Sequence, residues 1–424
     1  MNLKPDLTSV LKKIRKQSMN ECLISNSTKL DKIIDLGMHP FADTFINKKD
    51  FGKPEPVYPL QCYLCKETGQ VQVGYITQAN ERYNLYDYSY TSSNSKFARN
   101  HWKKCSREVI EKTRLSINST IIEIGSNDGY LCKQFKILGY STFGVDSSKY
   151  IADIAIQNGI ETFCCIFDRE QSKNVKNHFG GADLVIANNV FNHSNDPVDF
   201  ARGVYDLLNE GGIFVYELPY WFSTIKTKKF DQIYHEHISY FTVKSSFNLL
   251  SKASFEIIDV QEVDYHGGSI RVYARKISRD KTPYKNDIVS KMINEEENFG
   301  LFEVETYHNF MKEITHNRDK FLSNLYKIRS QGYPIIGVGA AAKGNTFLNF
   351  YNLDSSVLEF ITDASIYKQG KFTPSTRIPI TGDEIFGEYD KVYALILSWN
   401  ISNIIKEKLK EFNKNIKFLT LGER

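Results

Sequence analysis

The segment FDQIYHEHISYF, residues 230–241, gathers side chains that can exchange protons. Tyr234, His235, Glu236 and His237 follow one another in a chain that has only nine histidines. Histidine titrates near neutral pH, which makes it a natural general base, and a neighbouring carboxylate can orient its ring. The segment is therefore a candidate acid–base centre, although a polar strand edge or turn would also explain it.

The backbone of this segment decides which side chains can act together. In an extended strand, alternate residues share a face, so Tyr234 and Glu236 would point one way and His235 and His237 the other. A centre that uses both Glu236 and His237 requires irregular backbone, and we predict a turn or loop here. We expect His235 to be the structural member of the group.

A glycine turn, EIGSNDG at residues 123–129, follows an apolar strand and opens a helix. Gly125 allows a ligand to approach the backbone, and the helix N-terminus offers free N–H groups. Asp146 ends the next strand, where an acid binds vicinal ribose hydroxyls. The G-x-x-x-G spacing departs from the dinucleotide fingerprint and favours a nucleoside without a pyrophosphate, such as S-adenosylmethionine. The alternative is a turn that only reverses the chain.

Two further glycine-containing turns are candidate ligand sites. GVGAAAKGNT places Gly339 and Ala340 at a strand-to-helix junction with Lys343 one turn later, which could hold a phosphate. HGGS, beginning at His266, precedes a strand and permits close approach of the backbone to a substrate. A purely structural turn explains either motif equally well.

The composition excludes several classes of protein. The net charge of +4 is small for 424 residues, so nucleic-acid binding has no electrostatic support. There is no run of about 18 apolar residues, and the polar, basic N-terminus has no apolar signal core. We therefore expect a cytoplasmic protein that binds neither nucleic acid nor membrane. The seven cysteines are then more plausible as thiols or metal ligands than as disulfides.

The elements that must position these groups follow a changing apolar pattern. Beyond about residue 119, the apolar stretches TIIEI, STFGVD, ADLVI and GGIFVYE alternate with helical segments, which is typical of a parallel sheet flanked by helices. A Lys-, Glu- and Asn-rich stretch with helical spacing follows, and then a second alternating unit. We predict an α/β fold in four parts: an N-terminal arm and lobe at 1–75, a main domain at 76–276, a helical linker at 277–328 and a smaller domain at 329–424.

The motifs occur in an order that resembles the S-adenosylmethionine-dependent sugar C-methyltransferases, which act on nucleotide-activated keto-deoxysugars. The resemblance runs from about Cys22 to the C-terminus, and the pairing of YHEH with HGGS is its most specific part. The motifs that carry it are LGMHPFADTF, CYLC, YSYTSSNS, EIGSNDGYL, NNVFNH, FDQIYHEHISY, HGGSIRV, GVGAAAKGNTFLN and DASIYKQGKFTP.

The resemblance implies a class I (Rossmann-like) methyltransferase domain, a small zinc-binding N-terminal lobe and a second Rossmann-like domain at the C-terminus. It places His237 as the general base. The residues expected in the catalytic pocket are Tyr88, His193, Tyr234, Glu236 and His237, with Asn189 beside them. Those expected around S-adenosylmethionine are Glu123, Gly125, Ser126, Asn127, Gly129, Asp146, Asn188 and Asn189. Those expected to bind the nucleotide sugar are Tyr90, His266, Gly267, Ser269, Gly339, Ala340 and Lys343.

These residues lead us to expect C-methylation of a nucleotide-activated keto-deoxysugar, at C3 of a 4-keto sugar, through an enolate that a general base generates. The alternatives are O- or N-methylation of a related nucleotide sugar or small molecule, and an interaction protein that has lost catalysis. The partner is then the nucleotide sugar, and the protein is a monomer or a homodimer.

The zinc-binding lobe departs from the family pattern. The family uses two C-x-x-C pairs, but the first pair here reads CLIS, so Ser25 stands where a second thiolate belongs. Structural zinc prefers four thiolate or imidazole ligands. We expect Cys22, Cys62 and Cys65 to share one coordination sphere and to retain zinc. The alternatives are a weaker site, a site completed by His39 or a water, and an empty site.

Overall fold

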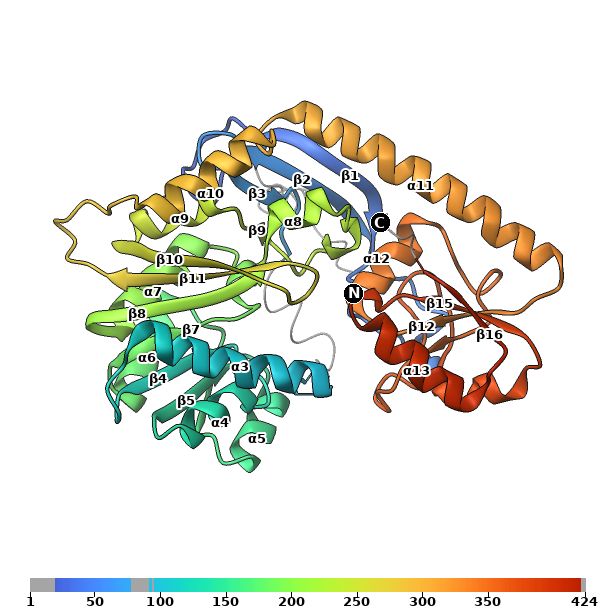
Figure 1. Ribbon diagram of the computed structural model, residues 1–424, viewed down its shortest axis with the longest axis horizontal. Helices are drawn as coiled ribbons and strands as arrows, with labels where there is room; N and C mark the ends of the chain where they lie inside the picture. Colours follow the sequence, from blue (N-terminus) through green and yellow to red (C-terminus); the bar gives the residue numbers. More distant parts are fainter. Residues whose placement is uncertain (1–19, 78–90, 94, 421–424) are drawn as a thin grey trace, which may run out of the picture.

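The computed structural model describes residues 20–77, 91–93 and 95–420, and within them the strands form three sheets. Figure 1 shows a small sheet at the top, a large sheet on the left and a third sheet on the right. Within these ranges no helix is both long and apolar enough to cross a membrane.

The small sheet is antiparallel and has the order β1-β2-β3-β9. Leu60, Cys62 and Leu64 alternate along β2 and are fully buried, so they share one face of the sheet. β9 follows the YHEH residues closely in the chain and pairs with β3, so the YHEH segment is fixed to the N-terminal lobe. The strands are β1 (Asp31–His39), β2 (Tyr58–Cys65), β3 (Gln70–Val73) and β9 (Ser239–Tyr240), and a short 3-10 helix, η1, spans Lys48–Asp50.

The large sheet has the order β10-β11-β8-β7-β4-β5-β6. β4 to β8 are parallel, whereas β11 is antiparallel to both β8 and β10. This order is that of a class I methyltransferase, as expected. The strands are β4 (Thr120–Ile124), β5 (Ser141–Asp146), β6 (Thr162–Cys164), β7 (Ala182–Ile186), β8 (Leu208–Pro219), β10 (Phe255–Val263) and β11 (Ser269–Lys276).

The position of β4 in this sheet predicts where a ligand binds. The chain leaves β4 toward β5 and β6 on one side and later returns to β7 and β8 on the other, so the strand order reverses at β4. Ligands of open α/β sheets bind at the carboxyl ends of the strands at such a point. The helices of this part are α3 (Lys96–Thr113), α4 (Tyr130–Ile137), α5 (Lys149–Gln157), α6 (Arg169–Phe179), α7 (Pro197–Leu207), α8 (Trp221–Lys226) and α9 (Val243–Lys252), with 3-10 helices η2 (Phe191–His193) and η3 (Phe230–Gln232).

The third sheet is parallel and has the order β14-β13-β12-β15-β16, which is Rossmann-like as expected. Its strands are β12 (Ile335–Val338), β13 (Ile361–Thr362), β14 (Ile380–Thr381), β15 (Val392–Ile396) and β16 (Ile416–Leu419). The helices around it are α12 (Ala342–Phe350), η4 (Asp383–Glu388), η5 (Trp399–Ile401) and α13 (Ser402–Phe412).

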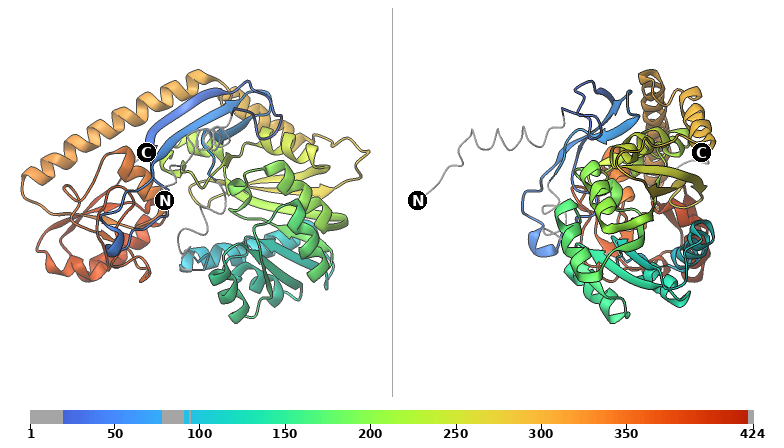
Figure 2. Two further views of the ribbon diagram at one scale, coloured as in Figure 1. Left: turned by 180° about the vertical axis from the view of Figure 1, so that it is seen from behind. Right: turned by 90° about the vertical axis from the view of Figure 1, so that its left-hand side faces the viewer.

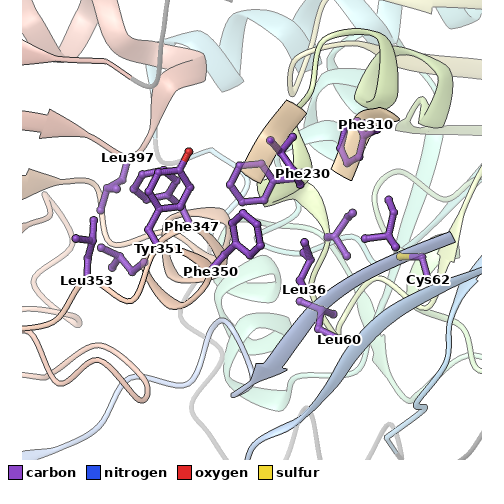
Figure 3. Packing of buried hydrophobic residues seen from close by; sticks show 14 of the residues in the cluster. Leu36, Leu60, Cys62, Phe230, Phe310, Phe347, Phe350, Tyr351, Leu353 and Leu397 are labelled. Atoms are coloured by element: carbon purple, nitrogen blue, oxygen red, sulfur yellow. The ribbon is translucent and has the colours of Figure 1, made fainter. Parts of the chain in front are cut away.

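Two helices, α10 (Asp287–Asn298) and α11 (Val304–Ser330), connect the large sheet to the third sheet. α11 packs against β1 and spans the top of the molecule in the front and rear views (Figures 1 and 2). One apolar core joins the lobe, α11 and the third sheet. Within this core, Phe230 of η3 lies between Phe347 and Phe350 of α12 on one side and strands β1 and β2 on the other (Figure 3). The three parts are therefore packed into one body.

Candidate functional site

The turn after β4 is shaped by two glycines with left-handed backbone. Gly125 has φ +71° and Gly129 has φ +75°. A Cβ on Gly125 would lie 2.8 Å from the Val190 side chain, and one on Gly129 would lie 3.0 Å from Ile160. Both positions therefore require glycine, and the first brings the turn against the loop that follows β7.

The Asp146 carboxylate lies directly behind this turn. Its Oδ2 accepts a hydrogen bond from the Asn127 N–H at 2.9 Å, and its Oδ1 accepts one from the Ser148 N–H at 2.9 Å. Burial raises the pKa of Asp146, while these two N–H groups oppose the rise. A carboxylate offers about four acceptor positions, so Asp146 is oriented by the backbone and can still accept two ribose hydroxyls.

Among the buried polar atoms at this end of the sheet, Ser126 Oγ and Asn188 Nδ2 have no hydrogen-bond partner among the described residues. Asn188 Oδ1 is already used, because it accepts from the Glu217 N–H at 2.9 Å. Buried polar atoms without partners are costly and rare in native proteins. Together with Asp146 they fit a polar nucleoside such as S-adenosylmethionine, for which the sequence predicts this site.

Glu123 is placed differently from the other expected cofactor residues. It is buried, its Oε2 lies 3.1 Å from the Cys132 sulfur, and burial raises the pKa of Glu123 to about 8. It therefore packs between β4 and α4 as a largely neutral acid at pH 7.

Asp128 is a site residue that sequence reasoning missed. Its carboxylate accepts hydrogen bonds from the hydroxyls of Ser92 and Ser93 at 2.7 and 2.5 Å, and Asn127 Oδ1 accepts from the Ser92 N–H at 2.8 Å. The turn after β4 thus anchors Ser92 and Ser93 of the motif YSYTSSNS. The signal was the acid inside the turn together with the serines of YSYTSSNS. Tyr88 and Tyr90 of that motif lie outside the described residues.

The loop after β7 joins the two halves of the site. It begins at Asn188 and Asn189, passes Val190 beside Gly125, and ends in η2 at His193. The Asn189 N–H donates to the Glu217 carbonyl at 2.9 Å, and Asn189 itself has φ +52°. The His193 ring lies 5.2 Å from the His237 ring, measured between centroids. One short loop therefore connects the turn after β4 with the YHEH segment.

The YHEH segment has irregular backbone, which confirms the prediction. It forms a turn at residues 235–236, closed by a hydrogen bond from the His237 N–H to the Tyr234 carbonyl at 3.0 Å. A turn, unlike a strand, brings residues three apart to the same side. The Tyr234 and His237 rings accordingly lie 3.9 Å apart between centroids.

Hydrogen bonds fix the tautomer of His237. Its Nδ1 lies 3.1 Å from the Gln232 carbonyl oxygen, which can only accept, so Nδ1 carries the proton. Nε2 then presents its lone pair to the Tyr234 hydroxyl at 2.7 Å. Burial lowers the pKa of His237 to about 4, so the ring is neutral at physiological pH. This pair is a neutral imidazole whose free nitrogen already faces a proton donor.

His235 and Glu236 face the N-terminal lobe instead. The His235 ring is fully buried, contacts Phe41 and Tyr58 edge-on, and has Nε2 3.3 Å from the Pro59 carbonyl oxygen. Glu236 Oε1 accepts a hydrogen bond from the Asp43 N–H at 3.3 Å. The turn thus divides its side chains, with Tyr234 and His237 on one side and the lobe contacts on the other.

The HGGS turn lies between the large sheet and the C-terminal domain. Its His266 and Gly267 carbonyls accept hydrogen bonds from Gln232 Nε2 at 2.5 Å and Lys229 Nζ at 2.6 Å. A Cβ on Gly267 would lie 2.4 Å from Trp399 of η5. Ser269 donates its hydroxyl back to the Tyr265 carbonyl at 2.9 Å. The glycine therefore permits contact between domains.

The turn after β12 offers a lysine rather than free backbone groups. The Gly339 N–H donates to the Thr362 carbonyl at 2.7 Å, and the Ala340 N–H donates to the Asp363 carboxylate at 2.8 Å. Lys343 lies beside Asn400 and 4.6 Å from the Trp399 ring, and burial lowers the pKa of its amine to about 8. Of the three expected phosphate contacts in this turn, the Lys343 side chain is the one not committed to the domain's own backbone.

A buried charge network behind the site was also missed. Glu217 at the end of β8 accepts from His101 Nε2 at 2.7 Å and from Arg271 Nη2 at 2.7 Å. Although burial opposes its charge, His101 and Arg271 hold the pKa of Glu217 below its usual range. The His101 ring stacks on Tyr265 at 3.7 Å, next to the HGGS turn. Glu217, His101 and Arg271 come from three separate elements, so no local motif predicted their contact.

The expected zinc ligands do not assemble. Cys62 faces the core shared with the C-terminal domain, whereas Cys22 and Cys65 belong to the core of the large sheet. Among the described residues no group of three or more His, Cys, Asp or Glu side chains could hold a metal ion. His39 is engaged elsewhere, with Nε2 3.0 Å from the Leu36 carbonyl oxygen. The expectation that Cys22, Cys62 and Cys65 share one coordination sphere is therefore wrong, because alternation along β2 turns Cys62 to the opposite face.

Three family models match successive parts of the chain. They are described as "Putative zinc binding domain" for residues 22–83, "Methyltransferase domain" for residues 97–260 and "C-methyltransferase C-terminal domain" for residues 264–421. The chain is 28% identical to the C-methyltransferase NovU of Streptomyces niveus over 397 residues, which cover 94% of each protein.

Solved structures match the chain in part. Magnesium protoporphyrin IX methyltransferase of Synechocystis, with bound S-adenosylmethionine, is 13% identical and has a TM-score of 0.33, covering 42% of this chain and 79% of that one. An S-adenosylmethionine-dependent methyltransferase of Clostridium acetobutylicum is 14% identical with a TM-score of 0.34, covering 47% and 99%. From the three successive family matches and the full-length relative, the chain belongs to the S-adenosylmethionine-dependent C-methyltransferases that combine a lobe of the zinc-binding type, a methyltransferase domain and a C-methyltransferase C-terminal domain.

Proposed function

We propose that this enzyme methylates the carbon next to the ketone of a nucleotide-activated keto-deoxysugar, at C3 of a 4-keto sugar. The observation that carries the proposal is the Tyr234–His237 pair, which offers a neutral imidazole lone pair and a hydroxyl donor 2.7 Å apart. A C–H next to a ketone is acidic enough to be removed when the enolate oxygen is stabilised. Removal therefore needs a base and a hydrogen-bond donor at adjacent positions.

The two side chains divide this work. His237 Nε2 takes the proton from the substrate carbon, and the hydrogen bond that it received from Tyr234 is released. The Tyr234 hydroxyl can then donate to the enolate oxygen, so one bond is exchanged for another as charge develops. The Gln232 carbonyl holds the Nδ1 proton in place, which keeps Nε2 as the basic nitrogen throughout. S-adenosylmethionine, when bound, supplies the electrophilic methyl group.

The remaining residues orient the reactants. Asp146, with the turn after β4, holds the nucleoside end of the cofactor at the carboxyl end of β4. The loop from Asn188 to His193 spans the space between that turn and His237, and it sets the approach of methyl group and carbanion. Lys343 and Lys229, both within 5 Å of the Trp399 ring, supply positive charge for a nucleotide phosphate.

The product of the reaction tests the proposal. The enzyme is incubated with S-adenosylmethionine labelled in its methyl group and with nucleotide-linked 4-keto-deoxysugars, and the product is examined by NMR. A new methyl signal on C3 is expected. A labelled methyl on oxygen or nitrogen, or no transfer to any keto sugar while S-adenosylmethionine binds, would contradict the proposed substrate.

A further inference from the structure

The N-terminal lobe contains a four-residue cluster with mixed chemistry, which we call the thiol–hydroxyl cluster: Cys22, Ser25, Cys65 and Thr68. Cys22 Sγ lies 3.3 Å from Thr68 Oγ1, and Ser25 Oγ lies 3.8 Å from Cys65 Sγ. Along the chain, Cys22 and Ser25 form a C-x-x-S sequence in one turn, and Cys65 and Thr68 form a C-x-x-T sequence in the other. This is the spacing of a structural zinc site built from two C-x-x-C pairs, with two of the four sulfurs replaced by hydroxyls.

The backbone around these positions also has the form of a metal-binding turn. The N–H two residues ahead points at the side-chain heteroatom in three of the four cases: Ile24 N to Cys22 Sγ at 3.4 Å, Ser27 N to Ser25 Oγ at 3.3 Å, and Gln70 N to Thr68 Oγ1 at 3.3 Å. Such N–H groups orient the ligands around a metal. The second C-x-x-C pair of the zinc-binding pattern is therefore at Cys65 and Thr68, rather than at Cys62 and Cys65.

The donor set does not fit zinc. Zinc in structural sites takes thiolate, imidazole or carboxylate ligands, and a neutral hydroxyl is not among them. Only Cys22 and Cys65 are adequate ligands, and the described residues place no third His, Cys, Asp or Glu with them. In the cluster each thiol instead faces the hydroxyl of the other turn, so the four groups satisfy one another.

Other contacts hold the two turns in place. Lys252 Nζ donates to the Ile24 carbonyl at 2.6 Å, and Asn248 Nδ2 donates to the Thr68 carbonyl at 3.1 Å, both from α9 of the methyltransferase domain. Gln72 of β3 receives a hydrogen bond from the Leu23 N–H at 3.0 Å and donates to the Glu21 carbonyl at 2.9 Å. These bonds tie the first turn both to the sheet of the lobe and to the neighbouring domain.

We propose that the lobe of this enzyme folds without a metal, and that the thiol–hydroxyl cluster and its tethers to α9 and β3 take the place of zinc. The proposal concerns the lobe alone and is independent of the sugar substrate. By this proposal Thr68, like Ser25, stands at a position where the zinc-binding pattern has a ligating cysteine.

The first test is metal content and its effect on stability. The full chain is purified without an affinity tag or chelator, dialysed against metal-free buffer, and analysed for zinc by mass spectrometry. We expect far less than one zinc ion per chain and a melting temperature that neither a chelator nor added zinc changes. Zinc close to one per chain that survives dialysis, or a melting temperature that falls on chelation, would overturn the proposal.

The second test restores the two sulfurs. The double variant Ser25→Cys/Thr68→Cys should bind one zinc ion per chain and melt at a higher temperature when zinc is added. Cys62→Ala in the double-variant background is the matched control, and it should retain the zinc because Cys62 lies outside the cluster. A folded double variant that takes up no zinc, or one that loses zinc when Cys62 is replaced, would show that these four positions do not form one site. If the double variant does not fold, the zinc content of the wild type still decides.

Discussion

At the scale of single residues, hydrogen bonding determines which nitrogen of His237 can act as a base. Because the Gln232 carbonyl fixes the proton on Nδ1, the lone pair on Nε2 faces Tyr234 rather than a random direction. Neighbouring His235 has the same chemistry in solution but is committed to Phe41, Tyr58 and the Pro59 carbonyl. The two histidines, two residues apart, thus acquire different contacts because the backbone turns between them.

Asp146 makes a prediction at this scale about the cofactor. Replacing it by Asn keeps the shape but removes the charge, and it sets an NH₂ group against the N–H of either Asn127 or Ser148. Hydrogen bonds to charged groups contribute about 1.5–3 kcal/mol, so affinity for S-adenosylmethionine should fall at least about tenfold by calorimetry.

The matched control for Asp146→Asn is Asp354→Asn. Asp354 also accepts a backbone N–H, that of Ser356 at 2.8 Å, but it belongs to the C-terminal domain, between α12 and β13. It should cost some stability and leave cofactor affinity unchanged. Equal affinity in Asp146→Asn and the wild type would remove Asp146 from the cofactor site.

At the scale of elements, tight turns rather than helices position most of the site. The glycine turn after β4, the turn at residues 235–236 and the HGGS turn each present a backbone or side-chain group at a sheet edge. The alternating apolar strands of the large and third sheets were predictable because buried parallel strands read as continuous apolar runs. The turn in YHEH was predicted because strand alternation would separate Glu236 from His237, but the turn that forms pairs His237 with Tyr234 and leaves Glu236 beside the lobe.

Other parts could not be predicted from local patterns. β9 is only two residues long, and it joins a sheet whose other strands lie more than 150 residues earlier in the chain. The Glu217, His101 and Arg271 network likewise depends on contacts between β8, α3 and β11. The Cys62 prediction was wrong because spacing alone suggested a C-x-x-C pair, whereas strand alternation within β2 sends its two cysteines into different cores.

Gly267 makes a prediction about the contact between elements. Alanine at position 267 would adopt φ +86° and would place its Cβ 2.4 Å from Trp399 and 2.7 Å from Lys229 Nζ. Gly159→Ala is the matched control. Gly159 has φ +84° with nothing within 4 Å of the corresponding Cβ, so this variant introduces the backbone strain without a steric clash. That strain is about 1–2 kcal/mol.

We expect Gly267→Ala to lower the melting temperature more than Gly159→Ala does and to raise KM for the sugar substrate, because η5 must move away from the HGGS turn. Scanning calorimetry and steady-state kinetics measure both effects. Matching melting temperatures and unchanged KM in the two variants would mean that the Trp399 contact does not form.

At the scale of the whole molecule, a continuous core makes the three parts interdependent. The lobe, α11 and the C-terminal domain share one apolar cluster, and β9 attaches the YHEH segment to the lobe (Figure 3). The proposed nucleotide site at the C-terminal domain and the proposed base His237 therefore belong to one packed unit, and the stability of that unit depends on buried ionisable groups.

Buried histidines predict how stability depends on pH. Burial lowers the pKa of both His39 and His237 from 6.5 to about 4. Between these pKa values the unfolded chain binds more protons than the folded chain does. The contribution of these neutral histidines to the free energy of unfolding is therefore fully present above pH 6.5 and is lost as the pH falls toward 4. At pH 5.5 each of these histidines should lower the free energy of unfolding by about 1.4 kcal/mol.

His39→Gln isolates this effect, because glutamine can still donate to the Leu36 carbonyl but does not titrate. Its loss of stability between pH 7.5 and pH 5.5, followed by urea unfolding, should be smaller than that of the wild type by about 1.4 kcal/mol. An identical loss in the two proteins would show that His39 is not held neutral by burial.

The central claim is that His237 removes the proton from the substrate carbon, and solvent exchange measures that step directly. With S-adenosylhomocysteine in place of S-adenosylmethionine and a nucleotide-linked 4-keto-deoxysugar bound, the wild type should wash deuterium from solvent into the carbon next to the ketone. A positioned base contributes roughly 10²–10⁴-fold, so His237→Asn should slow exchange by that factor while both ligands still bind. His235→Asn, the matched control on the other side of the turn, should exchange at close to the wild-type rate. Exchange at the wild-type rate in His237→Asn would contradict the account and move the search for the base to His193.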